Sequence, residues 1–205
     1  MGPGTRRLCE LGGGEGVWLL GPLGVGFSAP GGGRRAILVG GGVGIAPLAI
    51  WQGELLGARG VSHAGGSPGR GGAYGEVVAL LGFRDRARAA GAALLREARL
   101  TTDDGSEGRA GPVTDLLRAE LERDPRAVVY ACGPAGMLEA TRAICAELGA
   151  PAQLALEAPM ACGFGACFGC VVPRRGGGYL RVCLDGPVID ASELERVPSD
   201  AGAPE

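Results

Sequence analysis

The chain has 205 residues, enough for one large domain or two small ones, and 46% of them are hydrophobic, which is enough for a buried core. Its formal net charge of −2 excludes the strongly basic surface typical of nucleic-acid-binding proteins. The 41 glycines and 14 prolines approach the composition of disordered chains, but much of the glycine falls in turns between apolar runs. The sequence therefore indicates a turn-rich globular protein.

Location and redox environment can be predicted from the apolar runs and the cysteines. Residues 1–16 lack the apolar core of a signal peptide. The run Ala36–Trp51 is interrupted by glycines and Pro47, and it is shorter than the roughly 20 residues that span a bilayer. We therefore expect a cytoplasmic protein without a membrane partner. Seven cysteines in a reducing compartment favour metal binding or redox chemistry over disulfides.

Strand and helix signals alternate from the first aliphatic run. Ala36–Val39 predicts a buried strand, followed by a glycine loop and an apolar helix from Ile45 to about Leu56. Residues 57–75 are low in complexity and are expected to form a loop. Val77–Phe83 predicts a second strand, and the alanine-rich stretch Arg86–Arg96 predicts a helix.

The second half of the chain continues this alternation. Strands are predicted at Arg99–Thr102, Ala127–Ala131 and Gln153–Leu156, and helices from Pro112 onward and over Pro134–Leu148. Strands that alternate with helices predict an α/β fold with a parallel sheet covered on both faces. After Glu157 the pattern changes to a cysteine- and glycine-rich segment, which is expected to form a second, smaller domain.

Four cysteines of this segment have the spacing of an iron–sulfur site. They are Cys162, Cys167, Cys170 and, after twelve intervening residues, Cys183. Four thiolates in a C-x4-C-x2-C…C pattern are the plant-type ligand set of a [2Fe–2S] cluster. Cys183 is expected to arrive from a separate strand, Tyr179–Leu184. A zinc site is the alternative, but such sites usually contain two C-x2-C pairs and this segment has one; buried free thiols are a third reading.

The remaining cysteines have other expected roles. Cys9 is expected to be an incidental thiol, and Cys145 a small buried residue of a helix. Cys132 follows a strand and precedes Gly133-Pro134, and ligands of open α/β sheets bind at the carboxyl ends of strands. Contact with a ligand and simple core packing are both open for Cys132.

The loop Gly40-Gly41-Gly42-Val43-Gly44 lies between a predicted strand and a predicted helix. Glycines there allow a pyrophosphate to approach the backbone, and the start of the helix supplies partial positive charge. The loop lacks the full G-x-G-x-x-G spacing, but beside a redox cluster it predicts dinucleotide binding. Glu157 could face a cofactor or be a surface carboxylate. His63 and Asp103-Asp104 are expected to be solvated.

Six segments together resemble a known family. They are GPLGVGF at 21–27, LVGGGVGIAPL at 38–48, LLGFR at 80–84, TTDDGSEG at 101–108, YACGPAGML at 130–138 and EAPMACGFGACFGCVV at 157–172. In this order they resemble the electron-transfer subunits of class 1B dihydroorotate dehydrogenase, within the ferredoxin–NADP reductase superfamily. The resemblance covers nearly the whole chain, and the cysteine segment is its most specific part.

The resemblance implies three parts: a remnant of an FAD-binding β-barrel at 1–33, an NAD-binding α/β domain at 34–157 and a [2Fe–2S] cluster domain at 158–205. NADH would give a hydride to FAD, and the cluster would carry single electrons to FMN in a separate dihydroorotate dehydrogenase catalytic subunit. The two subunits would form a hetero-oligomer of pyrimidine biosynthesis. The chain is thus expected to be an oxidoreductase component rather than a complete enzyme.

The resemblance also assigns site residues. The cluster ligands of the family match Cys162, Cys167, Cys170 and Cys183, and its nucleotide loop matches Gly40, Gly41, Gly42 and Gly44. The turn near the nicotinamide matches Cys132, Gly133 and Pro134. The tail of the flavin phosphate site matches Gly4 and Thr5. The Arg-x-Tyr-Ser-type motif that holds the flavin in the family has no counterpart here. We therefore expect an amino-terminally truncated relative with an incomplete FAD site. Pro159 is a second departure, because the family usually has arginine there.

Two rival functions remain. Another NAD(P)H-dependent reductase subunit, linked to ferredoxin or hydrogenase, would share the cluster and the α/β domain and differ only in its electron acceptor. A non-catalytic zinc-binding interaction module would share only the cysteines. Metal analysis separates the second rival, because iron with acid-labile sulfide excludes zinc.

Overall fold

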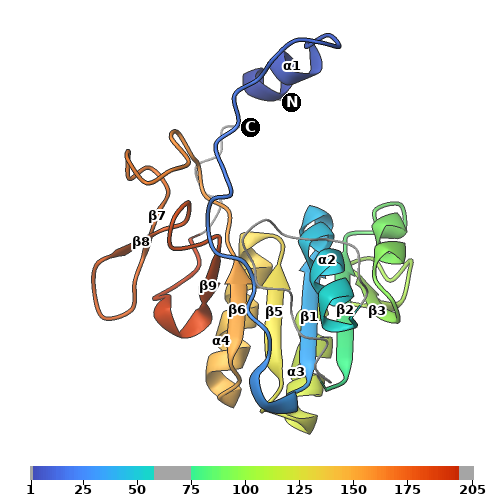
Figure 1. The fold of residues 1–205 in the computed structure, drawn as a ribbon. Coiled ribbons are helices and arrows are strands. Elements are labelled where there is room, and N and C mark those ends of the chain that lie inside the picture. The colour runs from blue at the N-terminus through green and yellow to red at the C-terminus, as the bar shows by residue number, and fades with distance from the viewer. Residues whose placement is uncertain (1, 58–74, 199–205) are drawn as a thin grey trace.

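The computed structural model describes residues 2–57 and 75–198, so nearly all of the predicted loop 57–75 lies outside the described residues. A seven-stranded sheet runs through the molecule in the order β4-β3-β2-β1-β5-β6-β9 (Figure 1). Its strands are β1 (Ala36–Gly41), β2 (Val77–Phe83), β3 (Ala98–Thr102), β4 (Arg109–Ala110), β5 (Val128–Cys132), β6 (Ala152–Ala155) and β9 (Val188–Asp190). Neighbouring strands pair in parallel except β9, which is antiparallel to β6. The predicted α/β class with a parallel sheet is confirmed.

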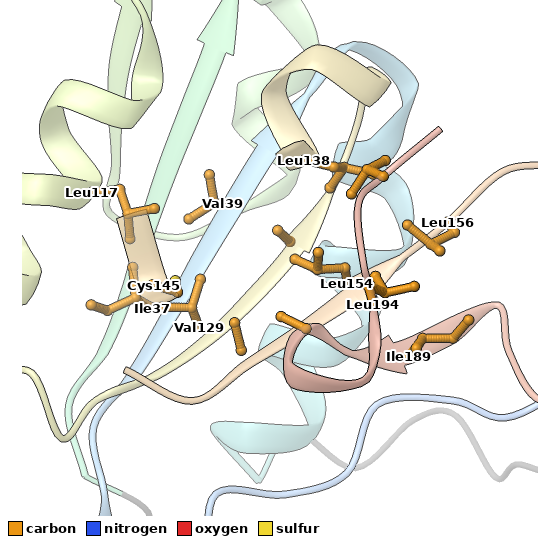
Figure 2. Packing of buried hydrophobic residues seen from close by; sticks show 14 of the residues in the cluster. Ile37, Val39, Leu117, Val129, Leu138, Cys145, Leu154, Leu156, Ile189 and Leu194 are labelled. Atoms are coloured by element: carbon orange, nitrogen blue, oxygen red, sulfur yellow. The ribbon is translucent and has the colours of Figure 1, made fainter. Parts of the chain in front are cut away.

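Helices cover both faces of this sheet, because successive residues of each buried strand point to opposite sides. Ile37 and Val39 of β1 belong to one core cluster with α3 (Val113–Arg123) and α4 (Ala135–Leu148). Leu38 lies between them in sequence and belongs to a second cluster with α2 (Ile45–Leu55). Figure 2 shows the first cluster, in which Leu117 and Leu138 approach side chains of the sheet.

The helix boundaries follow from local backbone chemistry. Pro112 caps α3 with an extended backbone, one residue before the first helical position. Proline has no backbone N–H to leave unpaired there, which suits the start of a helix. Gly149 ends α4 at a φ of 69°, a left-handed conformation that glycine adopts without steric cost. Both predicted boundaries are therefore confirmed to within one residue.

The predicted helix at Arg86–Arg96 is wrong, because the structure has only the 3-10 helix η3 (Ala89–Leu94) there. The amide side chain of Gln52, on α2, accepts from the Arg96 N–H at 2.8 Å and donates to the Arg96 carbonyl at 2.9 Å. These bonds hold Arg96 as a strand residue would be held, and Leu95 is already extended. Because the chain is already extended at Leu95, an α-helix that reaches Arg96 cannot form.

The cysteine-rich segment forms a small two-stranded sheet from β7 (Val171–Pro173) and β8 (Tyr179–Arg181), and then returns to the main sheet as β9 and the 3-10 helix η4 (Ala191–Glu193). Its buried side chains share one core cluster with α3 and α4, including Val182 and Leu194. The expected strand Tyr179–Leu184 is shorter than predicted, because it ends at Arg181 and Cys183 lies in the following turn. The three-part division of the chain stays a prediction.

The amino-terminal residues begin with helix α1 (Pro3–Cys9), in which no residue is buried, and reach the sheet through an extended segment and the 3-10 helix η1 (Gly31–Gly33). Phe27 packs against Trp51 and Tyr130, with ring centroids 5.9 and 5.5 Å apart. The Tyr130 hydroxyl donates to the Ser28 carbonyl at 2.9 Å. These contacts attach the segment to the α2 face. Among described residues 2–33 no strand is formed, so the barrel remnant also stays a prediction. In the described ranges, no helix has the length and hydrophobicity needed to cross a membrane.

Candidate functional site

The carboxyl ends of β1 and β5 lie side by side at the point where the strand order of the sheet reverses. From β1 the chain moves through α2 to β2 on one side, and β5 occupies the other side of β1. Connections that leave in opposite directions open a crevice between two strand ends, and ligands of open α/β sheets bind in such crevices. The glycine loop after β1 and the Cys132-Gly133-Pro134 turn after β5 therefore meet where sequence reasoning placed a nucleotide.

The two turns touch through their backbones. A Cβ atom added to Gly44 would overlap the Cys132 carbonyl group and lie 2.6 Å from the Gly133 nitrogen. Glycine is required at this position by close approach rather than by an unusual φ angle. Beside this contact lies a cavity of about 320 Å³. It is lined by Gly41, Gly42, Val43, Gly44, Gly133, Pro134, Ala135, Leu138, Leu156, Glu157, Val197 and Pro198.

Five of the seven residues predicted for the nucleotide line this cavity, and the other two do not. Gly40 lies beneath it within β1, where an added Cβ would meet the Leu81 side chain at 2.8 Å. The Cys132 side chain is 8% exposed and belongs to the core cluster on the α2 face. Burial, and secondarily the charge of Glu157, raises the pKa of the Cys132 thiol to about 11, so it is uncharged at neutral pH. The burial of Cys132 favours core packing, and its contact with a ligand stays a prediction.

Glu157 is the only carboxylate among the residues that line the cavity. It follows β6 directly, its side chain is exposed, and it accepts no hydrogen bond or ion pair among the described residues. Glu157 is both exposed and at the rim of the cavity, so its contact with a cofactor stays a prediction. A free carboxylate at this edge can accept hydrogen bonds from an amide or hydroxyl group of a ligand.

Val197 and Pro198 also line the cavity, and sequence reasoning missed both of them. The Val197 N–H donates to the Glu139 carboxylate at 2.8 Å, and Arg142 holds that carboxylate at 2.6 Å. The segment after η4 is thereby fixed beside the start of α4. This contact joins residues 58 positions apart, so no local pattern in the sequence could have revealed it.

Gly4 and Thr5, which match the flavin phosphate site by resemblance, lie on α1. Both are exposed, and an added Cβ at Gly4 would have no neighbour within 4 Å. Neither residue lines the nucleotide cavity. The assignment of Gly4 and Thr5 stays a prediction.

The four cysteines lie as two pairs in the segment that follows Glu157. Cys162 and Cys167 form the outer, more accessible pair; Cys170 and Cys183 form the inner, buried pair, 3% and 5% exposed. Backbone N–H groups point at the sulfurs: Ala166 donates to Cys162 at 3.3 Å, Gly169 to Cys167 at 3.4 Å and Cys183 to Cys170 at 3.5 Å. Such bonds stabilise negative charge on sulfur.

The pKa shifts of Cys162, in the outer pair, and Cys183, in the inner pair, have opposite directions. Hydrogen bonds from the Cys167 and Phe164 backbones lower the pKa of Cys162 to about 6, so this thiol ionises readily. The pKa of Cys183 is raised, first because its thiol is hydrogen-bonded to Cys170 and then because it is buried. Metal ligation requires thiolates, so the lowered pKa of Cys162 favours its ligation of a metal.

The donor set fits a [2Fe–2S] cluster in its chemistry. It offers four sulfurs, two for each iron, together with N–H groups directed at three of them. Gly163 and Gly165 have φ angles of 73° and 86°, which lets the loop curl around the sulfurs. Within residues 2–57 and 75–198, no three or more His, Cys, Asp or Glu side chains are grouped closely enough to hold a single metal ion. The arrangement is thus two thiol pairs, and the assignment of the four ligands stays a prediction.

Comparison with known proteins identifies this cysteine segment. Residues 157–195 match the family model described as the iron–sulfur cluster binding domain of dihydroorotate dehydrogenase B. The matched range begins at the cavity-lining Glu157 and contains all four cysteines.

Curated relatives match over most of the chain. The dihydroorotate dehydrogenase B (NAD(+)) electron transfer subunit of Bacillus caldolyticus is 43% identical over 203 residues, covering 94% of this chain and 70% of the relative. The probable subunit of the same name from Methanopyrus kandleri is 37% identical over 195 residues, covering 95% and 68%. A solved structure of an NADH-dependent reduced ferredoxin-NADP oxidoreductase, an enzyme of flavin-based electron bifurcation, matches with a TM-score of 0.71 at 28% identity. That match covers 94% of this chain and 65% of the solved one.

Proposed function

The chain belongs to the family of dihydroorotate dehydrogenase B (NAD(+)) electron transfer subunits, and from this premise we propose what it does. It passes electrons between NADH and an FMN-containing catalytic subunit that interconverts dihydroorotate and orotate. The observation that carries the proposal is that one strand end, β6, leads from the dinucleotide cavity directly into the cysteine loop. Glu157 lines the cavity, and Cys162 follows it five residues later. Their Cα atoms are therefore no more than about 18 Å apart.

The nucleotide half of the proposal rests on the crevice between β1 and β5. The start of α2 follows the Gly42–Gly44 turn, so unpaired N–H groups and the positive end of the helix dipole face a bound pyrophosphate. Gly133, Pro134 and Glu157 also line the cavity, and Glu157 is the lining residue that leads into the cysteine loop. We assign the nicotinamide to the part of the cavity lined by Glu157, because the reacting ring must lie toward the electron acceptor.

The cluster half rests on the four cysteines. A [2Fe–2S] cluster held by Cys162 with Cys167 and by Cys170 with Cys183 supplies a one-electron carrier. The inner pair is buried in the core cluster shared with α4, which fixes the position of the site relative to the sheet. The outer pair lies toward solvent, where a partner protein can approach.

A hydride carries two electrons, so a flavin is needed between NADH and a one-electron carrier. The flavin contacts of Gly4 and Thr5 stay a prediction, and we route no step through FAD in this chain. We propose instead that electron transfer from NADH requires flavin supplied from outside the described residues. The FAD content of the purified protein tests this directly.

The partner is proposed to dock over the cysteine loop. Met160, Phe164 and Phe168, which flank the outer cysteine pair in sequence, are 49%, 50% and 61% exposed, and Tyr179 on β8 is 70% exposed. Exposed apolar side chains gathered at one place mark protein–protein contacts. The partner is then the catalytic subunit of a hetero-oligomer. The seven free cysteines agree with a cytoplasmic location, where thiols stay reduced.

The function is tested by mixing the purified chain with a class 1B catalytic subunit, FAD, NADH and orotate under anaerobic conditions. We expect NADH-dependent formation of dihydroorotate that is lost when Cys167 is replaced by serine. Dihydroorotate formation at the same rate without the chain, or with the Cys167→Ser variant, would contradict the proposal.

A second candidate acceptor is ferredoxin, which the similarity to the solved ferredoxin-NADP oxidoreductase favours. The same mixture with ferredoxin in place of the catalytic subunit separates the two acceptors. Faster reduction of ferredoxin than of the FMN subunit would favour the ferredoxin-linked reading. Zinc without iron in protein purified anaerobically would instead support the interaction module.

A further inference from the structure

Arg181 lies between the two halves of the cysteine segment, close to both cysteine pairs in sequence or through its side chain. It is the last residue of β8 and lies opposite Val171, the residue that follows Cys170. Two residues later the chain reaches Cys183. The backbone of Arg181 is therefore adjacent to both members of the inner cysteine pair.

The side chain of Arg181 extends over the loop that carries the outer pair. Its guanidinium carbon lies 5.5 Å from the centre of the Phe168 ring, and Phe168 is bonded to Cys167. One of its terminal nitrogens would lie 3.7 Å from a Cβ added to Gly165, between Cys162 and Cys167. The stack on Phe168 and the contact at Gly165 place a positive charge against the cysteine loop.

Asp185 holds Arg181 from the other side. Its carboxylate accepts from the Arg181 backbone N–H at 2.7 Å and lies 3.6 Å from the guanidinium Nε. The two side chains are 33% and 37% exposed, so solvent screens the attraction between them. Asp185 orients Arg181 and offsets part of its positive charge. The group that stacks on the cysteine loop is the guanidinium group of Arg181, not the carboxylate of Asp185.

We propose that Arg181 sets the reduction equilibrium of the four-cysteine site. This inference rests on the proposed function, because it requires the cysteines to hold a [2Fe–2S] cluster. Reduction adds one negative charge to the site, and a fixed positive charge close by stabilises the reduced form more than the oxidised form. Arg181 therefore makes the site easier to reduce. The stack on Phe168 restricts the guanidinium group, so its charge acts at a fixed place.

The experiment is an EPR-monitored redox titration of the full-length, anaerobically purified protein and three variants. In Arg181→Gln we expect the reduction equilibrium to move about threefold to tenfold toward the oxidised form, given a partly exposed charge. For a one-electron couple this is a fall of about 30 to 60 mV. Arg181→Lys keeps the charge and is expected to keep most of the wild-type potential.

Arg175→Gln is the matched control. Arg175 is exposed in the turn between β7 and β8, and its replacement removes the same charge from the same small sheet. We expect no measurable shift in its potential. If Arg181→Gln does not retain iron, Phe168→Leu replaces it, because losing the ring frees the guanidinium group and lowers the potential in the same direction.

The outcomes distinguish this inference from the proposed function. A wild-type protein without iron, sulfide or a reduced EPR signal would overturn both. A normal wild-type signal with the same potential in Arg181→Gln and Arg175→Gln would overturn only the role of Arg181. An equal fall in Arg181→Lys and Arg181→Gln would also overturn it, because the charge would not be the cause.

Discussion

Gly44 packs against the backbone of Cys132, so closely that no side chain fits between the turn after β1 and the turn after β5. We predict that Gly44→Ala pushes these turns apart and destabilises the protein by about 1–3 kcal/mol, as overpacking in a filled site does. Because both turns line the nucleotide cavity, NADH affinity is expected to fall at least tenfold. Isothermal titration calorimetry and denaturant unfolding measure the two effects.

Gly53→Ala is the control for this substitution. Gly53 lies in α2, away from the cavity, and an added Cβ has no neighbour within 4 Å. Alanine in place of glycine inside a helix stabilises by roughly 0.5–1 kcal/mol. We expect Gly53→Ala to bind NADH normally. Unchanged NADH affinity in Gly44→Ala would show that the contact between the turns does not shape the cavity.

Cys167 is predicted to be a cluster ligand, and its loss is expected to remove the cluster. Cys167→Ser should abolish the [2Fe–2S] EPR signal of the dithionite-reduced protein, because serine is a poor substitute for a thiolate ligand of iron. Cys9→Ser is the matched control, since Cys9 is exposed on α1 outside the site. A full signal in Cys167→Ser would refute the ligand assignment.

Asp103 stands at the same edge of the sheet as the glycine loop. It follows β3, and its N–H donates to the Phe83 carbonyl at the end of β2 at 3.0 Å. Its side chain is exposed. A carboxylate at this edge accepts hydrogen bonds from ribose hydroxyls and repels a 2′-phosphate. We predict that Asp103→Ser lowers the ratio of NADPH to NADH dissociation constants about tenfold or more; an unchanged ratio would place the ribose elsewhere.

Glu120 holds an ion network at the opposite end of the sheet, and its side chain is 3% exposed. It pairs with Arg35 at 2.5 Å, with Arg123 at 3.1 Å and with Arg99. Burial alone would raise the pKa of Glu120, but hydrogen bonds from Arg35 and Arg99 lower it below its ordinary value. The stability that this carboxylate contributes is present above its unfolded pKa, about 4.3, and is lost as the pH falls through the lower folded pKa.

Glu120→Gln should therefore destabilise the protein by about 2 kcal/mol at pH 7, because the buried Arg35 side chain loses one of its two carboxylate partners. The difference from wild type should begin to narrow below about pH 4.3, where the unfolded carboxylate takes up a proton, and should vanish only below the lowered pKa of folded Glu120. Urea unfolding of both proteins at several pH values measures this difference in the free energy of unfolding. A difference that stays constant down to pH 3 would show that the charge of Glu120 is not the source of the stability.

Local patterns predicted the regular part of the fold. The run Val77–Phe83 is β2 with the same bounds, because a short aliphatic run between breakers has little alternative to a buried strand. The spacing of the four cysteines likewise identified the segment that the family model matches.

The misses depend on contacts between distant residues. Gln52 bonds the backbone of Arg96 and limits η3 to a short 3-10 helix, although the alanine-rich sequence favours a longer α-helix. Val197 reaches the nucleotide cavity only because Glu139 accepts its N–H. Arg181 is one of 20 basic residues, and only the fold places it against Phe168. None of these contacts leaves a periodicity or a motif in the sequence.

The central claim is that electrons from NADH reach the four-cysteine site. It is tested most directly by EPR spectroscopy of the anaerobically purified protein, frozen after the addition of NADH and FAD. The account predicts iron and acid-labile sulfide in equal amounts, about two of each per chain, and a reduced [2Fe–2S] signal that NADH produces. The contradicting result is a protein that contains iron and sulfide in this ratio but gives the reduced signal only with dithionite. NADH with FAD would then fail to reduce the cluster, and the central claim would be wrong.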